Sequence, residues 1–315
     1  MRVLFMGTPE FALWSLRALI ASGEELVGVV TQPDQPKGRG YVLTPPPVKV
    51  CAAENGIPVC QPEKLRTQEF SDLLSRLDPE LIVVTAYGKI LPQAVLDYPV
   101  YGCINVHGSL LPEYRGAAPI QRAIMDGKKE TGITTMMMDA GLDTGDILLT
   151  GRVAITPEDT FETVHDKMGE CGARVLLQTL DALKNGTLTR TPQDGARATY
   201  AAKIEKSDCL LRFDEPAERV HDRIRGLSPF PLAFTRTPDG KLLKVTAAAV
   251  SAGHSARGAA PGTVLAAADG RITVACAVGA IDLLGVLPEG KGRMTAAAFL
   301  NGRKLAVGDR LGAES

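Results

Sequence analysis

The sequence contains no long apolar run. No stretch approaches the ~20 consecutive apolar residues with which a helix crosses a bilayer, although 45% of the 315 residues are hydrophobic. The apolar start of the chain stops at Gly7 and is followed by Thr8 and Pro9, which makes it too short for a signal peptide. It is typical of a buried first strand instead. We therefore expect a globular, cytoplasmic protein that does not contact membranes.

Aromatic residues and metal-binding patterns are also scarce. Aromatics make up 5% of the chain, so the cores must consist mainly of Ala, Val, Leu and Ile. None of the six cysteines forms a CxxC pair or lies at zinc-ligand spacing from a histidine: Cys51, Cys60, Cys103, Cys171, Cys209 and Cys276. The sequence predicts unpaired thiols in a reducing compartment and no metal site.

The net charge is close to zero but unevenly distributed. The formal charge is −1, and residues 201–315 carry 16 basic against 12 acidic side chains. The second part of the chain is therefore modestly basic. This is compatible with a phosphate-rich partner and does not by itself demonstrate one.

Short apolar runs alternate with helical patterns in the first part of the chain. Apolar runs predict strands at residues 2–6, 26–31, 81–86, 103–106, 134–138 and 147–153. Helical patterns predict helices at residues 10–22, from 45 to 54, and at 160–183. Strands that are apolar on both faces and separated by helices indicate an α/β domain with a Rossmann-like parallel sheet.

The second part of the chain has a different pattern. Residues 187–207 are rich in Thr, Gly, Pro and Gln and lack periodicity, which is typical of a linker. A helical segment at 216–227 follows, and then short β-type runs separated by turn residues. The sequence predicts a catalytic domain at 1–186, a linker at 187–207 and a small β-barrel or sandwich at 208–315.

The turn after the first strand excludes dinucleotide cofactors. It reads Gly7-Thr8-Pro9-Glu10, with one glycine where a Rossmann fingerprint needs GxGxxG. Glu10 would repel a phosphate from the start of the helix. We therefore do not expect NAD or FAD.

Chemically active residues are densest around Asn105 and His107. They lie two positions apart at the end of an apolar strand, so their side chains point to the same face. In open α/β sheets, ligands bind at this carboxyl end of the strands. An acidic, glycine-rich turn at residues 139–146 delivers Asp143, which can hydrogen-bond His107 and fix its tautomer.

An amide, an imidazole and a carboxylate together suit acyl transfer. The amide and the imidazole can donate to an oxygen that becomes negative, and the carboxylate can support the imidazolium or assist proton removal. An alternative remains open at this point: Asn105 and Asp143 serve turns, and His107 is a satisfied core histidine.

Several segments resemble the folate-dependent formyltransferases. They are residues 105–112 (NVHGSLLP), 115–121 (RGAAPIQ), the turn at 139–145, and residues 7–12, 31–34 and 86–92, with weaker similarity at 261–264 and 301–302. The closest resemblance is to the branch that acts on aminoacyl-tRNA. It implies a Rossmann-like formyltransferase domain followed by a β-barrel-like (OB-like) tRNA-binding domain.

The resemblance also implies substrates and site residues. The donor would be 10-formyltetrahydrofolate, and the acceptor the α-amino group of initiator methionyl-tRNA, in support of translation initiation. Asn105, His107 and Asp143 would be catalytic, in a monomeric enzyme. Two segments would line the folate site: Ser109, Leu110, Leu111 and Pro112, and Tyr87, Gly88, Ile90 and Leu91.

The same family inserts a basic loop after the second strand to meet the acceptor end of the tRNA. In this chain the loop is residues 32–45, and Lys37 and Arg39 would contact the RNA. In the second domain, five cations could follow the tRNA backbone: Arg219, Arg223, Arg225, Lys241 and Lys244.

Three other functions compete with this one. The acceptor could be a small amine, such as a nucleotide-sugar amine or glycinamide ribonucleotide, although neither requires the basic loop or a second domain. Water could replace the amine and give a hydrolase, but such relatives carry an N-terminal regulatory domain, and here the first strand begins at Arg2. The chain could also be a non-catalytic RNA-binding module, against which the presence of all three candidate catalytic residues argues.

Overall fold

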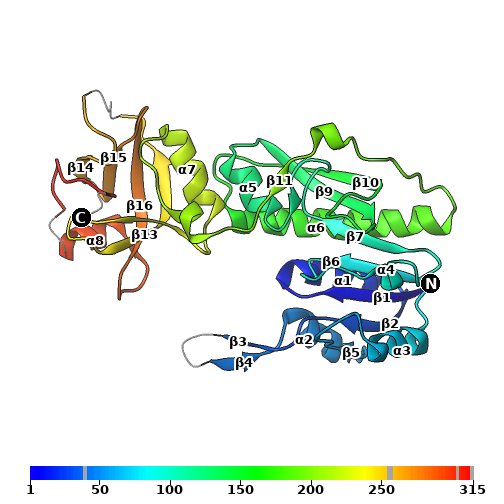
Figure 1. Cartoon of the computed structure of the whole chain (residues 1–315). Helices are drawn as coiled ribbons and strands as arrows, with labels where there is room; N and C mark the ends of the chain where they lie inside the picture. Colours follow the sequence, from blue (N-terminus) through cyan, green and yellow to red (C-terminus); the bar gives the residue numbers. More distant parts are fainter. Residues whose placement is uncertain (38–40, 254–257, 303–304, 313–315) are drawn as a thin grey trace. The chain divides into compact units, whose positions relative to one another are not determined.

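The computed structural model describes residues 1–37, 41–253, 258–302 and 305–312, and the chain divides into two compact units (Figure 1). Unit 1 comprises Met1–Pro119, Glu130–Ala154 and His165–Ala201. Unit 2 comprises Ile120–Lys129, Ile155–Val164 and Ala202–Ser315. No helix in these described ranges is long and apolar enough to span a membrane.

Unit 1 is built on a seven-stranded sheet in the order β10-β9-β7-β6-β1-β2-β5. The sheet strands are β1 (Arg2–Gly7), β2 (Glu25–Val30), β5 (Val59–Cys60), β6 (Leu81–Thr85), β7 (Cys103–His107), β9 (Glu130–Met137) and β10 (Ile147–Ala154). The five strands from β5 to β7 are parallel, whereas β9 pairs antiparallel with both β7 and β10. The predicted Rossmann-like sheet is confirmed, with an antiparallel edge.

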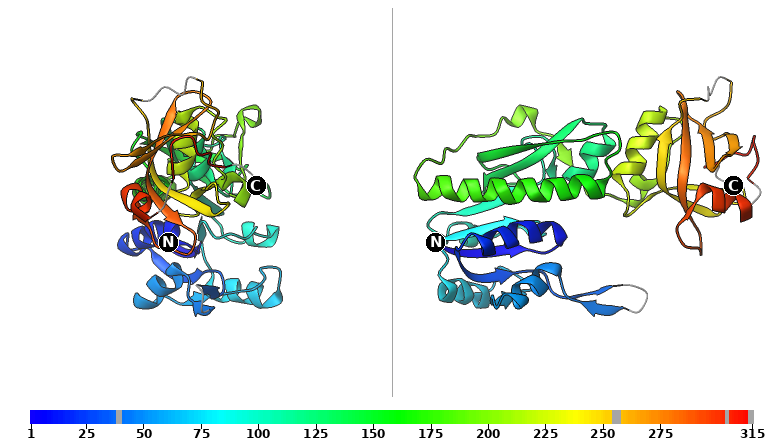
Figure 2. Two further views of the ribbon diagram at one scale, coloured as in Figure 1. Left: turned by 90° about the vertical axis from the view of Figure 1, so that its left-hand side faces the viewer. Right: turned by 180° about the vertical axis from the view of Figure 1, so that it is seen from behind.

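Helices cover both faces of this sheet (Figure 2). The helices are α1 (Glu10–Ala21), α2 (Pro47–Glu54), α3 (Gln68–Leu77), α4 (Gln93–Leu96) and α6 (Phe161–Lys184), the last of which begins in unit 2. Phe70 of α3 and Val95 of α4 share a core cluster with Leu4 and Ile82. On the other face, Ser15 of α1 accepts a hydrogen bond from Thr85 at 3.1 Å. This double cover explains why the parallel strands are apolar throughout.

The remaining elements of unit 1 are short. They are β3 (Gln35–Lys37) and β4 (Val42–Thr44), which form a hairpin, and β8 (Arg115–Gly116), η1 (Gly195–Arg197) and β11 (Tyr200–Ala201). β11 pairs parallel with β8, and Thr191 and Ile147 exchange two backbone hydrogen bonds. Residues 191–201, which the sequence predicts as part of a linker, are therefore hydrogen-bonded into unit 1.

Unit 2 contains an antiparallel sheet in the order β12-β13-β16-β15-β14, with β17 paired to β16. Its elements are α5 (Pro119–Met125, from Ile120 onward), η2 (Lys206–Cys209), α7 (Ala217–Gly226), β12 (Ala233–Arg236), β13 (Leu242–Val250), β14 (Val264–Ala268), β15 (Arg271–Ala275), β16 (Ala280–Pro288), β17 (Met294–Thr295) and α8 (Ala296–Gly302). α7 packs on the sheet through Val220 and Ile224, both buried in one core cluster with Val245 and Leu283. The β-rich second domain matches the prediction, and its described strand pairings form an open path that does not return to β12.

Candidate active site

The structure brings Asn105, His107 and Asp143 together at the carboxyl end of β7. Asn105 and His107 are the third and the last residues of β7, and Asp143 lies in the turn between β9 and β10. Asn105 Nδ2 donates to Asp143 Oδ1 at 3.4 Å, and His107 Nδ1 lies 3.6 Å from Asp143 Oδ2. The site is largely buried, since the side chains of His107 and Asp143 are 7% and 14% exposed.

The tautomer of His107 is set differently from the sequence prediction. The predicted hydrogen bond between His107 and Asp143 is not formed, because Nδ1 lies 3.6 Å from the nearer carboxylate oxygen. His107 Nε2 instead lies 3.0 Å from the carbonyl oxygen of Tyr114. A carbonyl only accepts, so Nε2 carries a hydrogen and Nδ1 faces the carboxylate. Any proton on Nδ1 would therefore be held between the ring and Asp143.

The turn that carries Asp143 is closed by its own polar groups. Asp139 Oδ1 accepts hydrogen bonds from the amide of Gly141 at 3.0 Å and from Thr144 Oγ1 at 2.6 Å. Gly145 must be glycine, because a Cβ there would collide with the carbonyl oxygen of Met137. Asp143 itself adopts a left-handed conformation with φ +53°, which Asp tolerates better than most residues.

A second loop supplies the remaining contacts of the site. The amide of Gly116 donates to Asp143 Oδ2 at 2.8 Å, so the carboxylate is held from the β8 side as well. Tyr114, whose carbonyl binds His107, has φ +59°, and its amide donates to Thr199 Oγ1 at 2.8 Å. A non-glycine residue in this backbone region is uncommon and indicates that its surroundings hold it there.

Two further residues complete this arrangement, and the sequence prediction missed both. Gln193 Nε2 donates to the carbonyl oxygens of Asp143 and Gly145 at 2.9 and 2.7 Å. Arg115, which is 6% exposed, donates from Nε and Nη2 to Gln193 Oε1 at 3.1 and 2.7 Å. Arg115 lies in the RGAAPIQ segment, which could have identified it. Gln193 lies in the supposed linker, where no pattern marks it.

The residues predicted to line a folate site have mixed accessibility. Ser109 is fully buried, and its hydroxyl donates to the carbonyl of Glu113 at 2.6 Å. The buried Leu111 donates its amide to Thr134 Oγ1 at 3.1 Å, and Leu110 and Pro112 are partly exposed.

The second predicted folate-lining segment, which follows β6, also contains both buried and exposed residues. Tyr87 and Leu91 are buried in the core cluster with α3 and α4, and burial raises the pKa of the Tyr87 phenol to about 12. Gly88 is exposed, and Ile90 is 80% exposed. The side chains of Tyr87, Leu91 and Ser109 thus support this surface from within, and Ile90 forms its exposed apolar part.

The predicted RNA contacts separate into three groups. Arg39 lies outside the described residues, and Lys37 ends β3 of the hairpin. The prediction for Arg225 is wrong, because the residue is 4% exposed and its guanidinium binds Asp222 and the carbonyls of Thr156 and Asp159. The guanidinium of Arg223 also has partners within the protein. It donates to both carboxylate oxygens of Glu215 at 3.1 Å and to the backbone carbonyl of Leu210.

The other three predicted cations are more accessible, since Arg219 and Lys241 are exposed and Lys244 is half-buried. Arg219 lies 3.9 Å from Asp126, and Lys241 pairs with Asp239 at 2.8 Å. Lys244 Nζ donates to the carbonyl of Pro231 at 3.2 Å, and Arg293 Nη2 to that of Pro229 at 3.0 Å. Phe230, between these two prolines in the sequence, is 76% exposed, so two cations bind the backbone on either side of an exposed aromatic residue.

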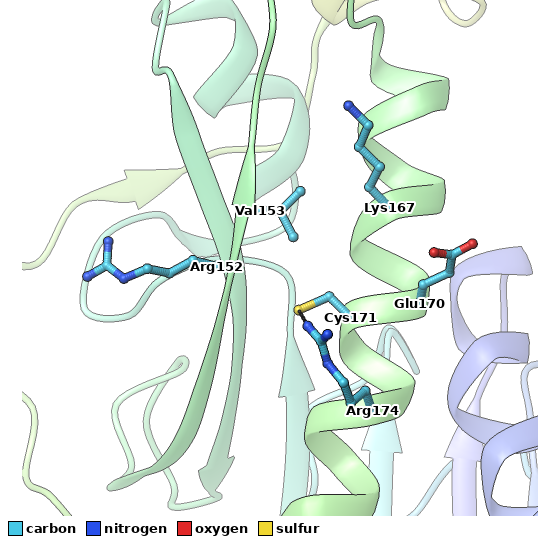
Figure 3. Close-up of a pocket in the computed structure, with 6 residues that line it drawn as sticks. All are labelled: Arg152, Val153, Lys167, Glu170, Cys171 and Arg174. Carbon is cyan, nitrogen blue, oxygen red and sulfur yellow. Dashed lines mark hydrogen bonds between the residues drawn. The ribbon is translucent and has the colours of Figure 1, made fainter.

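Unit 1 also has a hollow that is separate from this site. Figure 3 shows it between β10, which provides Arg152 and Val153, and α6, which provides the other four lining residues: Lys167, Glu170, Cys171 and Arg174. Arg174 Nη2 lies 3.5 Å from the sulfur of Cys171. The lining is mainly charged and contains none of Asn105, His107 and Asp143.

Comparison with known proteins identifies the relatives of the chain. The formyl transferase family matches residues 1–180, and the formyl transferase C-terminal domain matches residues 203–304. A methionyl-tRNA formyltransferase of Citrifermentans bemidjiense is 48% identical over 312 residues, covering 99% of this chain and 96% of that protein.

Two solved structures share the fold at low sequence identity. The methionyl-tRNA formyltransferase of Clostridium thermocellum has a TM-score of 0.54 at 19% identity, over 81% of this chain and 95% of that one. HypX of Aquifex aeolicus, solved in complex with tetrahydrofolic acid, has a TM-score of 0.63 at 17% identity. It covers 95% of this chain and 47% of its own.

Proposed function

The chain belongs to the formyl transferase family, and within it to the methionyl-tRNA formyltransferases; on this premise we propose that it formylates the α-amino group of initiator methionyl-tRNA. The donor is 10-formyltetrahydrofolate, and the enzyme acts as a cytoplasmic monomer in translation initiation. The observation that carries this proposal is the convergence of Asn105, His107 and Asp143.

The three side chains have complementary tasks in the transfer. The attacking amine forms a bond to the formyl carbon, and the carbonyl oxygen becomes negative before the bond to the folate nitrogen breaks. Asn105 directs one amide hydrogen at Asp143 and retains a second for that oxygen. His107 carries positive charge at Nδ1 when protonated, and Asp143 at 3.6 Å stabilises it. Overall the amine loses one proton, and the folate nitrogen gains one.

The donor and the acceptor would approach over different surfaces. β6 and β7 are parallel neighbours, so the segments that follow them leave the sheet at the same edge. Ile90, Leu110 and Pro112 offer exposed or partly exposed apolar surface there for the folate, and Gly88 allows close backbone approach. On the acceptor side, Lys37 ends β3, which pairs with β4, and the described residues Tyr41 and Leu43 are 81% and 67% exposed.

A formyl-transfer assay tests the function directly. We expect the protein to transfer formyl from 10-formyltetrahydrofolate to charged initiator tRNA, and to use an amino sugar nucleotide or glycinamide ribonucleotide at least about 10³-fold less efficiently. Such a ratio is within what differential binding of a large acceptor provides. Release of formate without any acceptor would favour the hydrolase, and efficient use of a small amine would favour the small-acceptor enzyme.

Variants on the acceptor side should separate RNA binding from folate binding. We expect Arg39→Ala and Phe230→Ala each to raise KM for methionyl-tRNA about tenfold, through a lost phosphate contact and a lost base stack. KM for the folate donor should stay within about twofold. Phe230→Trp retains a stacking surface and should restore tRNA affinity, and Arg76→Ala, at an exposed arginine of α3, serves as the control. A parallel rise in both KM values would contradict these assignments.

A further inference from the structure

The segment at residues 191–201 is attached to the site at three points. Thr191 exchanges backbone hydrogen bonds with Ile147, the first residue of β10. Tyr200 and Ala201 pair with Arg115 and Gly116 of β8. Between these attachments, Gln193 reaches the turn that carries Asp143. A single stretch of chain therefore holds both the turn and the loop that surround His107.

The amide of Gln193 is oriented by its partners. Arg115 has donors only, so the oxygen of the amide must face the guanidinium and its NH2 must face the carbonyls of Asp143 and Gly145. All four contacts lie between 2.7 and 3.1 Å. Two hydrogen bonds from a charged group to one amide oxygen are strong and geometrically specific. The amide is thus fixed at both ends.

These contacts act on the backbone that immediately follows the Asp143 side chain. The carbonyl of Asp143 and that of Gly145, two residues later, are held by one NH2 group, so the turn can neither rotate nor slide freely. Beyond the backbone, the carboxylate is located by Gly116, whose strand pairs with β11. Asp143 then stands at 3.6 Å from His107 Nδ1, a distance over which an ångström changes the interaction substantially.

We propose that Gln193, oriented by Arg115, is a positioning residue for Asp143. It acts through the backbone of the turn and touches neither substrate. The inference rests on the proposed function only in assigning a catalytic task to Asp143. Segment 191–201 is thereby part of the catalytic apparatus.

Substitution of Gln193 tests this role through kinetics. Gln193→Met removes both donors at similar size, and Gln193→Glu keeps the pairing with Arg115 but also cannot donate to the carbonyls. We expect both to lower kcat about 10²-fold, the loss typical of misplacing a catalytic group by about 1 Å. KM for donor and for tRNA should change less than about threefold. Gln178→Glu, the same change at an exposed glutamine of α6 outside this segment, should keep wild-type kcat.

Hydrogen exchange provides a second readout that does not depend on activity. The Gly116 amide donates to the Asp143 carboxylate, so its exchange should quicken at least about tenfold in both variants if the turn moves away. Exchange in the core of β1 should be unchanged, which distinguishes displacement from unfolding.

Each outcome has a distinct meaning. Wild-type kcat in Gln193→Glu would overturn the positioning role, because the pairing with Arg115 alone would then suffice. A fall in kcat with normal Gly116 exchange would also overturn it. If the unmodified protein transfers no formyl group, the proposed function fails, while the exchange experiment still decides whether Gln193 holds the turn.

Discussion

Replacing Asp143 with asparagine should lower kcat about 10³- to 10⁴-fold, comparable to the loss of the orienting carboxylate in a catalytic triad. The carboxylate accepts from the Gly116 amide at 2.8 Å and lies 3.6 Å from His107 Nδ1. The other ring nitrogen, Nε2, is bound by the Tyr114 carbonyl. An amide at this position carries no charge to stabilise a proton on Nδ1. Its NH2 group, if turned toward Gly116, would face another donor.

Single-turnover kinetics with pre-bound tRNA would measure this effect on the chemical step. Asp146→Asn is the matched control, because Asp146 lies in the same turn and contacts Met137 through its backbone carbonyl, which accepts from the Met137 amide. We expect Asp146→Asn to remain within about twofold of the unmodified protein, in keeping with a substitution away from the reacting groups. An equal fall in kcat in the two variants would show that any substitution in this turn disturbs activity. Asp143 would then have no specific role in the proposed mechanism.

The regular part of the fold follows closely from the sequence. Runs such as LIVVT in β6 are buried on both faces, and the predicted strand at 81–86 differs from the observed Leu81–Thr85 by one residue. The prediction for α6, residues 160–183, is shifted by one position from Phe161–Lys184. Long periodic patterns and continuous apolar runs determine these elements locally. The positions of Asn105 and His107 at a strand end follow from the same pattern.

What could not be predicted depends on contacts between distant residues. An apolar run does not reveal strand direction, so the antiparallel β9 and β10 could not be distinguished from parallel strands. Segment 191–201 has the composition of a linker, and its order comes from partners such as Arg115, about 80 positions earlier. From the sequence, Arg225 is indistinguishable from an exposed cation on a helix. In the structure it is buried and donates to the carbonyls of Thr156 and Asp159.

Replacing Asn105 with alanine should lower kcat about 10²- to 10³-fold, which corresponds to the ~2.7–4 kcal/mol that a single oxyanion donor provides. Asn105 is half-buried on β7, and its amide is only weakly engaged by Asp143 at 3.4 Å, so it remains available to a reacting oxygen. Asn105→Asp should be at least as slow. It removes the donor and also places a second carboxylate beside the first, and their repulsion would drive the turn away from β7.

The two variants together with tRNA binding decide between an enzyme and an RNA-binding module. Neither change touches the β3–β4 hairpin or the surface around Phe230, so the dissociation constant for methionyl-tRNA should stay within about twofold in both. Asn185→Ala, at the C-terminal end of α6, controls for the loss of an asparagine elsewhere in unit 1. A non-catalytic module would bind tRNA equally well with either residue and transfer no formyl group in any form. Loss of transfer without loss of tRNA binding in both Asn105 variants, with normal transfer in Asn185→Ala, is the result expected if this amide acts on the reacting oxygen.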